Sequence, residues 1–206
     1  MRLYHFPLSS NARRARMTAI QLGIPVEEVV VDLAKGQQRA PDFLALNPAG
    51  RVPVLVDGDF VLTESHAIMA YLADKSGPTP LYPTELQPRA DVNRWLFWSA
   101  HHFTPAVSVL NWERLVKGLI GGQPADPKEE ERGERLVTEC ARLLDDHLAK
   151  NEWLAQGRLT LADIAVATPL MSTVPARLPI DDRRHLRAWF GRIQELESWK
   201  KTNPSR

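Results

Sequence analysis

Residues 47–55 read Asn-Pro-Ala-Gly-Arg-Val-Pro-Val-Leu, and residues 63–68 read Thr-Glu-Ser-His-Ala-Ile. Pro53 stands where an apolar strand pattern begins, and because proline has no backbone N–H it belongs at a strand edge, a first strand position or a special turn. We predict a cis Val52–Pro53 bond, which would turn the backbone groups of Val52 outward. An extended peptide would then pair with Val52 as an added strand. This segment therefore predicts a site for a short peptide.

The second segment places an acid and a hydroxyl at a helix start. Free N–H groups and the positive end of the helix dipole favour a carboxylate beside Ser65, while the carboxylate of Glu64 suits an ammonium group. An ordinary helix start after a hairpin explains residues 63–65 taken alone. Together with Pro53, however, they favour a ligand end that carries both charges, as an amino acid does.

The first part of the chain alternates strand and helix patterns in the order βαβαββα, which predicts a mixed sheet with helices on its faces, an α/β fold. The turn Asp57-Gly58 is a strong hairpin signal. The predicted strands are residues 2–6, 26–33, 52–56 and 60–62, and the predicted helices are residues 11–22, 35–46 and 64–75.

Residues 76–83 contain three prolines and a glycine, so they continue neither helix nor strand. We expect a linker at residues 77–86 between a domain of residues 1–76 and an all-helical domain of residues 87–206. Within the latter, Asp126-Pro127 is a helix start, and Thr160 with Asp163 forms a capping box. The predicted helices are residues 88–118 with a kink at Pro105, 127–149, 161–173 and 183–197.

Composition narrows the function. The chain has 206 residues, with 26 Lys plus Arg against 25 Asp plus Glu and a formal net charge of +1, so no basic surface argues for nucleic acid or an anionic membrane. The single Cys140 excludes an internal disulfide, and the first residues lack the apolar segment of a signal peptide. No apolar run approaches the roughly 20 residues of a membrane span. We expect a soluble cytoplasmic protein with small-molecule partners.

Residues 7–11, Pro-Leu-Ser-Ser-Asn, lead from the first strand into the first helix. A hydroxyl or amide donor at a helix N-terminus would stabilise a thiolate, whose formation near neutral pH needs about 1.4 kcal/mol for each unit by which its pKa is lowered. Ser9, Ser10 and Asn11 are the three candidates, and each is also an ordinary helix cap. Arginines within residues 13–16 occupy turns where acids are preferred, and this broken local rule points to a functional site.

At this point the sequence resembles the glutathione transferase superfamily over nearly its whole length, of a bacterial cytosolic type with a serine-like or beta-like class. The resemblance lies in N-P-x-G-x-V-P-x-L at residues 47–55, E-S-x-A-I at residues 64–68 and the capping box. It implies a thioredoxin-like domain that binds glutathione, followed by a helical domain that lines the pocket for a small electrophile. It also implies a detoxifying, cytoplasmic homodimer in which glutathione is the substrate or co-substrate.

The resemblance assigns the sulfur donor in more than one way. Ser9 matches the serine of theta-like and delta-like classes by its distance from Pro7, whereas Ser10 matches the cysteine of the bacterial beta class. Asn11 is a third candidate because an amide also donates. His5 occupies the position of the beta-class tyrosine, which argues against a tyrosine mechanism.

The resemblance also suggests how the rest of glutathione is held. It implies that Val52 and Pro53 pair with the peptide main chain. Glu64 and Ser65 would hold its charged end. The group expected near the glycine carboxylate is Lys35, Gln37, Gln38 and Arg39.

The pocket for the second substrate is expected on the first long helix of the second domain, at Trp98, His101, His102 and Trp112. Helical spacing predicts that Trp95 and Phe103 are core residues. The paired histidines lack a matching acid or cysteine cluster, so we expect no metal. Cys140 lies among apolar residues and is interpreted as inert packing.

Two alternatives stay open. A glutathione-dependent cis–trans isomerase of the maleylacetoacetate type has the motif S-S-C-x-x-R, which residues 9–14 resemble. Asn11 in place of its cysteine and Glu64 in place of its glutamine argue against it. The other alternative is a non-enzymatic module of the same fold that binds other molecules, which fold alone does not exclude.

Overall fold

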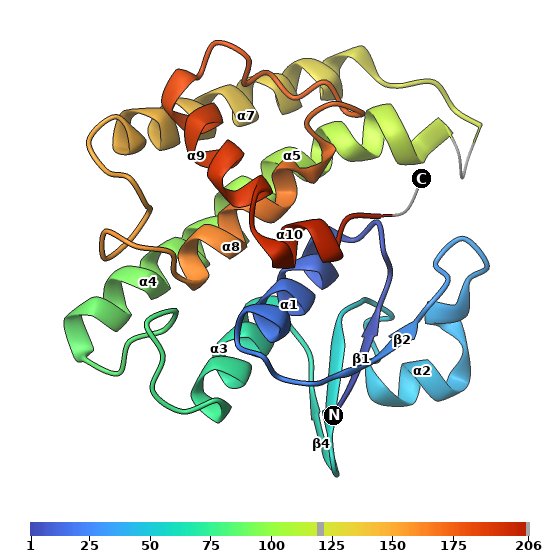
Figure 1. The fold of residues 1–206 in the computed structure, drawn as a ribbon. Coiled ribbons are helices and arrows are strands. Elements are labelled where there is room, and N and C mark those ends of the chain that lie inside the picture. Colours follow the sequence, from blue (N-terminus) through green and yellow to red (C-terminus); the bar gives the residue numbers. More distant parts are fainter. Residues whose placement is uncertain (119–121, 205–206) are drawn as a thin grey trace. The chain divides into compact units, whose positions relative to one another are not determined.

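The computed structural model describes residues 1–118 and 122–204 and contains two compact units (Figure 1). One unit consists of Met1–Thr84 together with the chain from Glu195 onward, and the other consists of Glu85–Gln194. The last part of the chain therefore belongs with the first unit, whereas the sequence assigned all of residues 87–206 to a helical domain.

The first unit contains a four-stranded mixed sheet with strand order β2-β1-β3-β4. β2 runs parallel to β1, and β3 pairs antiparallel with both β1 and β4. This agrees with the predicted α/β fold. The strands are β1 (Arg2–His5), β2 (Glu27–Val30), β3 (Val54–Asp57) and β4 (Phe60–Leu62), and the helices are α1 (Ser10–Gln21), α2 (Pro41–Leu46), α3 (Ser65–Lys75) and α10 (Glu197–Lys201).

Alternating side chains of the strands form two separate cores. Leu3 and Leu55 pack with Ile68 of α3 and with alanines of α1 on one face of the sheet. Val54 and Val56 pack with Phe43 of α2 on the other face. Each such fully buried apolar side chain contributes about 1.5–3 kcal/mol. The period of two in the strand therefore fixes which helices cover which face.

The strand expected over residues 52–56 is Val54–Asp57, and two other predicted elements of the first unit differ more from the structure. The strand expected over residues 26–33 is shorter, Glu27–Val30. The helix expected over residues 35–46 is a 3₁₀ turn, Gln37–Arg39, followed by α2. Pro41 supplies the reason for the break, because it occupies the first turn of α2 and holds the preceding Ala40 in an extended conformation.

The second unit is helical. Its helices are α4 (Leu86–Trp98), a π-helical segment (Ser99–Phe103), α5 (Thr104–Asn111), a second π-helical segment (Trp112–Val116), α7 (Pro127–Leu148), α8 (Leu161–Ala167), a 3₁₀ segment (Thr168–Ser172) and α9 (Arg184–Gln194). Trp95 and Phe103 are buried, as predicted.

The long helix expected over residues 88–118 is interrupted twice by these π-helical segments. The first ends at Phe103, two residues before Pro105, where the kink was predicted. Pro105 has no N–H to donate to the carbonyl of His101 one turn earlier, so the widened turn falls where the regular ladder is already broken. The helix expected over residues 183–197 is α9, which ends at Gln194; after the extended Leu196 a separate helix, α10, begins at Glu197.

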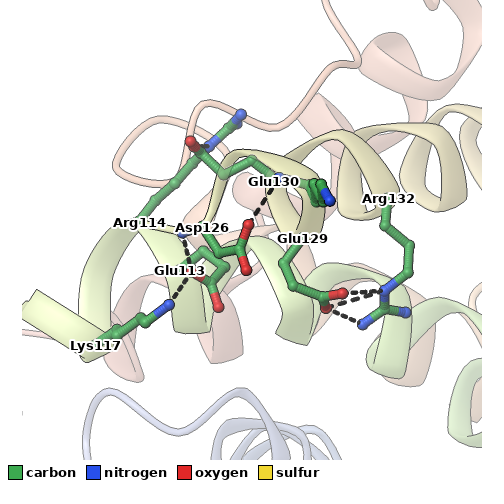
Figure 2. Close-up of polar contacts among 8 residues, drawn as sticks. Glu113, Arg114, Lys117, Asp126, Glu129, Glu130 and Arg132 are labelled. Atoms are coloured by element: carbon green, nitrogen blue, oxygen red, sulfur yellow. Dashed lines mark hydrogen bonds and ion pairs between the residues drawn. The ribbon is translucent and has the colours of Figure 1, made fainter. Parts of the chain in front are cut away.

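Polar contacts fix the start of α7 (Figure 2). Asp126 caps α7 by accepting a hydrogen bond from the backbone N–H of Lys128 at 2.9 Å, as the Asp126-Pro127 signal predicts. The buried carboxylate of Glu113 accepts from Lys117 Nζ at 2.9 Å and from the backbone N–H of Asp126 at 2.7 Å. Glu113 therefore joins the cap of α7 to the preceding π-helical segment.

Asp163 organises the core of the second unit. The predicted capping box is present at the start of α8. The buried carboxylate accepts from the backbone N–H of Thr160 at 2.9 Å, from that of Leu154 at 3.0 Å and from the indole N–H of Trp189 at 2.9 Å. Burial raises the pKa of Asp163 to about 6, against the lowering effect of these donors. One side chain thus joins α8, α9 and the loop between α7 and α8.

We expect the substitution Asp163→Asn to lower the free energy of unfolding by about 2–4 kcal/mol, because an amide NH₂ would face N–H donors that would lose their acceptor. The pKa in the folded protein lies above the ordinary 3.8, so the folded state binds the proton more tightly. The wild type should therefore lose stability relative to the variant as pH rises from about 4 to 6.

Urea unfolding at a series of pH values measures both effects. Asp181→Asn, which removes an exposed acid, is the matched control and should change little. A loss for Asp163→Asn no larger than for this control would contradict the central role of Asp163.

Candidate functional site

The directions of the strands bring three segments to one end of the sheet. Tyr4 pairs with Val54, so the end of β1 lies beside the start of β3. Leu55 pairs with Leu62, so the end of β4 lies there too. The loop into α1, the segment before β3 and the start of α3 therefore meet at this end. They carry Ser9, Val52 and Ser65, respectively.

At the start of α1 the structure distinguishes the three sulfur-donor candidates. Ser9 is the N-cap, and its Oγ accepts a hydrogen bond from the backbone N–H of Ala12 at 3.2 Å. Ser10 and Asn11 already lie inside the helix. A hydroxyl that accepts in a cap still has its proton to donate. Ser9 is therefore held in place by its oxygen and remains able to donate.

The segment before β3 is shaped by Asn47. Its side chain accepts from the backbone N–H of Ala49 at 3.1 Å and donates to the carbonyl of Arg51 at 2.7 Å. Gly50, in this turn, has a φ of 62°, in the left-handed region that favours glycine. The Val52–Pro53 bond that follows is cis, which confirms the prediction.

Val52 is buried, yet its backbone is unpaired. Within residues 1–118 and 122–204, neither its N–H nor its carbonyl forms a hydrogen bond with another backbone group. Most buried backbone groups in proteins form hydrogen bonds. An N–H and a carbonyl without partners beside a strand start therefore indicate a place where an extended chain can bind.

The start of α3 also has unused polar groups. Glu64 has a φ of 66°, which is strained for a residue other than glycine, and its side chain forms no cap to the helix. Ser65 is buried, and its hydroxyl forms no hydrogen bond to any other described residue. The first N–H groups of α3 thus have no side-chain cap, and uncapped N–H groups at a helix start suit a carboxylate.

A buried cation reinforces this end of the sheet. The guanidinium of Arg14 on α1 lies 2.8 Å from Nε2 of His66, the residue after Ser65. Burial lowers the pKa of Arg14 to about 9, so the group is still charged at neutral pH. Arg14 and His66 are not among the site residues expected from the sequence. The signal for Arg14 was the run of arginines where helices prefer acids.

The residues after β2 lie in two settings. Lys35 is exposed and pairs with Asp32 at 3.3 Å. Gln38 and Arg39 lie close to Gly50, because a Cβ built on Gly50 would be 3.0 Å from the Gln38 carbonyl and 3.1 Å from Arg39 Nη1. The structure therefore brings Gln38 and Arg39 to the segment before Val52. Gln37 accepts instead from the backbone N–H of Asp32.

His5 is the last residue of β1, so its backbone lies at this end of the sheet. Its side chain is buried, its Nε2 lies 3.5 Å from a carboxylate oxygen of Glu28, and neither ring nitrogen forms a hydrogen bond within the described part of the chain. Burial, and then the charge of Arg16, lower the pKa of His5, although Glu28 acts to raise it. The lowered pKa favours the neutral ring. His5 is thus a core residue.

The four residues expected around a second substrate lie in different surroundings. Trp98 stacks on Phe103, with ring centroids 5.5 Å apart, and belongs to an aromatic cluster with Trp95. His101 and His102 are exposed, and Trp112 is 49% exposed. Trp98 therefore contributes to packing, and the other three present their side chains at the surface of the second unit.

Metal-ligand groups, the free cysteine and apolar helices were the other features to locate in the described chain. In residues 1–118 and 122–204, no three His, Cys, Asp or Glu side chains lie together as metal ligands. Burial raises the pKa of the Cys140 thiol to about 11, consistent with packing rather than reactivity. A search of the same residues finds no helix with the length and apolar character needed to cross a bilayer.

Comparison with known proteins fits this α/β unit and helical unit to one class. Family models match residues 1–74 as the glutathione S-transferase N-terminal domain and residues 127–192 as the C-terminal domain. The chain is 36% identical to glutathione S-transferase F10 of Arabidopsis thaliana over 96% of its length and 94% of the relative. It is 40% identical to glutathione S-transferase 3 of Zea mays, covering 98% and 92%. The chain belongs to the glutathione S-transferase family and is an enzyme of that family.

Solved structures agree. Glutathione transferase F7 from Populus trichocarpa superposes with a TM-score of 0.90 at 27% identity, covering 98% of this chain and 96% of that one. Glutathione S-transferase-I bound with lactoylglutathione superposes with a TM-score of 0.87 at 28% identity, covering 98% and 97%. The two sequence relatives come from plants, and a theta-class enzyme of Homo sapiens, theta-2B, is 36% identical, so the sequence relatives do not single out the expected bacterial type.

We expect Gly50→Ala to destabilise the first unit by about 1–3 kcal/mol, because an L-residue at this positive φ costs about 1–2 kcal/mol and its Cβ would press on the Gln38 carbonyl. Gly58→Ala is the matched control: Gly58 has a φ of 59° but nothing within 4 Å of the added Cβ. Denaturant unfolding should show the larger loss for Gly50→Ala. Equal losses would mean that the contact with Gln38 is unimportant.

Proposed function

We propose that this enzyme binds glutathione at the described end of the sheet and activates its sulfur as a thiolate for attack on small electrophilic, hydrophobic substrates. The observation that carries the proposal is the unpaired, buried backbone of Val52. An N–H and a carbonyl side by side match the main chain of a peptide, and the uncapped start of α3 at the same end matches a carboxylate.

In this proposal each end of the tripeptide has its own partners. Val52, next to Pro53, pairs with the cysteinyl main chain. The hydroxyl of Ser65 and the N–H groups of α3 bind the carboxylate of the γ-glutamyl end, and Glu64 binds its ammonium. Gln38, Arg39 and Lys35 bind the glycine carboxylate, with Gln38 and Arg39 supported by their place against Gly50.

We assign the sulfur to Ser9 in preference to Ser10 or Asn11. Ser9 is the only one of the three that caps α1, which fixes its oxygen at the positive end of the helix dipole. Its proton is then available for the thiolate. The dipole adds a further favourable term for the anion.

The electrophile is proposed to bind against the helical unit, Glu85–Gln194, which replaces the helical domain of residues 87–206 expected from the sequence after a linker at 77–86 and a glutathione domain at 1–76. Exposed His101, His102 and Trp112, with the half-buried Trp98, are the candidates for that pocket. Calorimetric titration with glutathione, followed by assays with a panel of electrophiles, tests the proposal. No heat of binding and no conjugation would contradict it.

We also infer a cytoplasmic homodimer, supported by the family and by exposed apolar side chains such as Phe97 on α4, which is 64% exposed. Light scattering at micromolar concentration should give twice the chain mass of 23.2 kDa. A mass of one chain across the concentration range would contradict the dimer.

Replacing Ser9 by alanine should raise the pKa of bound glutathione and lower turnover near neutral pH by roughly ten- to hundredfold, since a hydrogen bond to a charged group contributes about 1.5–3 kcal/mol. The loss should shrink in alkaline buffer, where the thiolate forms unaided. The thiolate absorbance of bound glutathione against pH measures the shift.

Ser10→Ala and Asn11→Ala are the matched controls and should leave that titration curve in place. A shift caused by Asn11→Ala alone would make the amide the donor. Ser65→Ala and Glu64→Gln should instead weaken glutathione binding with little change in how the sulfur titrates, because they contact the far end of the tripeptide.

A further inference from the structure

The last helix of the chain packs on the helix that begins the site. α10 lies beside α1 within the first unit (Figure 1). The two helices are separated by nearly the whole sequence, and the side chain of Arg13 forms hydrogen bonds between them.

Arg13 is 1% exposed. Residues 199–203, here called the C-terminal clamp, contact the face of its guanidinium and accept hydrogen bonds from its N–H groups. Its guanidinium lies 3.6 Å from the ring centroid of Trp199. Its N–H groups donate to the carbonyl of Trp199 at 2.9 Å and to Oγ1 of Thr202 at 3.2 Å, with Oδ1 of Asn203 at 3.5 Å.

All these partners are neutral. Across the described parts of the chain, no carboxylate forms an ion pair with Arg13, whereas Arg16, one turn on, pairs with Glu28 at 2.8 Å. Burial, and then the charge of Arg16, lower the pKa of Arg13 to about 10, so the group remains a cation at neutral pH. Burying a charge without an opposite charge beside it is unfavourable. A buried cation at position 13 therefore suggests that the Arg13 guanidinium has a function.

The clamp acts on the turn that carries Ser9. The backbone N–H of Arg13 donates to the carbonyl of Ser9 at 2.9 Å, the first hydrogen bond of α1. Residues four apart lie on the same face of a helix. Contacts that hold the Arg13 side chain therefore also restrain the N-cap residue Ser9, to which the Arg13 backbone is hydrogen-bonded.

We propose that the C-terminal clamp, acting through Arg13, positions the first turn of α1 so that Ser9 is aligned with the sulfur of glutathione. Arg13 is then a positioning residue whose cation also favours an anion at the same helix end. Alignment of this kind requires tolerances of about 0.5 Å, which a helix end held only by its own hydrogen bonds does not guarantee. The inference rests on the proposed function.

The test compares Arg13→Met, Arg13→Lys and Trp199→Leu with Arg16→Met, which removes a cation of the same helix that the clamp does not hold. Three quantities are measured for each: the thiolate titration of bound glutathione, kcat and KM against pH, and amide hydrogen exchange at Arg13 and Arg14. The exchange experiment is performed without glutathione, so it reports on the clamp alone.

We expect Arg13→Met to raise the bound thiol pKa by about one unit and to lower kcat about tenfold at neutral pH, recovering in alkaline buffer with KM for glutathione little changed. Trp199→Leu, which keeps the cation, should show a smaller shift of the same sign and roughly tenfold faster exchange. Arg13→Lys keeps the charge but lacks the planar fork, so it should resemble Trp199→Leu. Arg16→Met should match the wild type.

Several outcomes overturn the inference. Arg13→Met and Trp199→Leu that titrate like the wild type would remove the link to Ser9 while leaving the proposed function intact. A loss of kcat by the same factor at every pH would show a merely structural role. If amide hydrogen exchange at Arg13 and Arg14 is unchanged in Trp199→Leu, the C-terminal clamp does not hold the first turn of α1. A wild type that forms no thiolate would instead overturn the proposed function, and this inference with it.

Discussion

The antiparallel pairing of β3 with both β1 and β4 is the constraint on which the candidate site depends. It makes β1 and β4 run in the same direction, so that α1 and α3 both begin at one end of the sheet. β3 begins at that end as well. A peptide placed there meets two helix N-termini and an unpaired strand start together, although the start of α1 is far from the other two segments in sequence. Apolar packing of both helices on one face of the sheet holds this geometry.

The site is assembled from groups that are unfavourable in the protein by themselves. Glu64 has a strained backbone, α3 lacks a side-chain cap, and Val52 has unpaired backbone groups. Each feature costs about 1–3 kcal/mol. The buried cations of Arg13 and Arg14 add to this. Such a concentration is explained if a bound anionic peptide satisfies these groups, and the two cores of the first unit supply the stability that tolerates them.

The second unit differs in that its central buried polar group has its hydrogen-bond partners within the protein. Its central polar residue, Asp163, has four hydrogen bonds from the protein and leaves no group for a ligand. Its capping box was visible in the sequence because capping is a local interaction between residues three apart. The candidates for the second substrate, in contrast, are surface side chains, whose arrangement depends on helix packing and on interruptions such as the π-helical segment before Pro105.

The sequence by itself determined the order of strands and helices in the first unit, the cis bond before Pro53 and the helix start at Ser65. These features depend on proline chemistry, on the hydrophobic period and on caps, all of which act over a few residues. It narrowed the sulfur donor to residues 9–11 without ranking them, because the choice depends on which backbone conformation places an oxygen at the N-cap. Only the tertiary structure showed that Ser9 is the cap and that residues 199–203 hold Arg13. Arg13 and Thr202, which are hydrogen-bonded, lie 189 positions apart in the sequence. No local pattern specifies which distant helix will bury a given side chain.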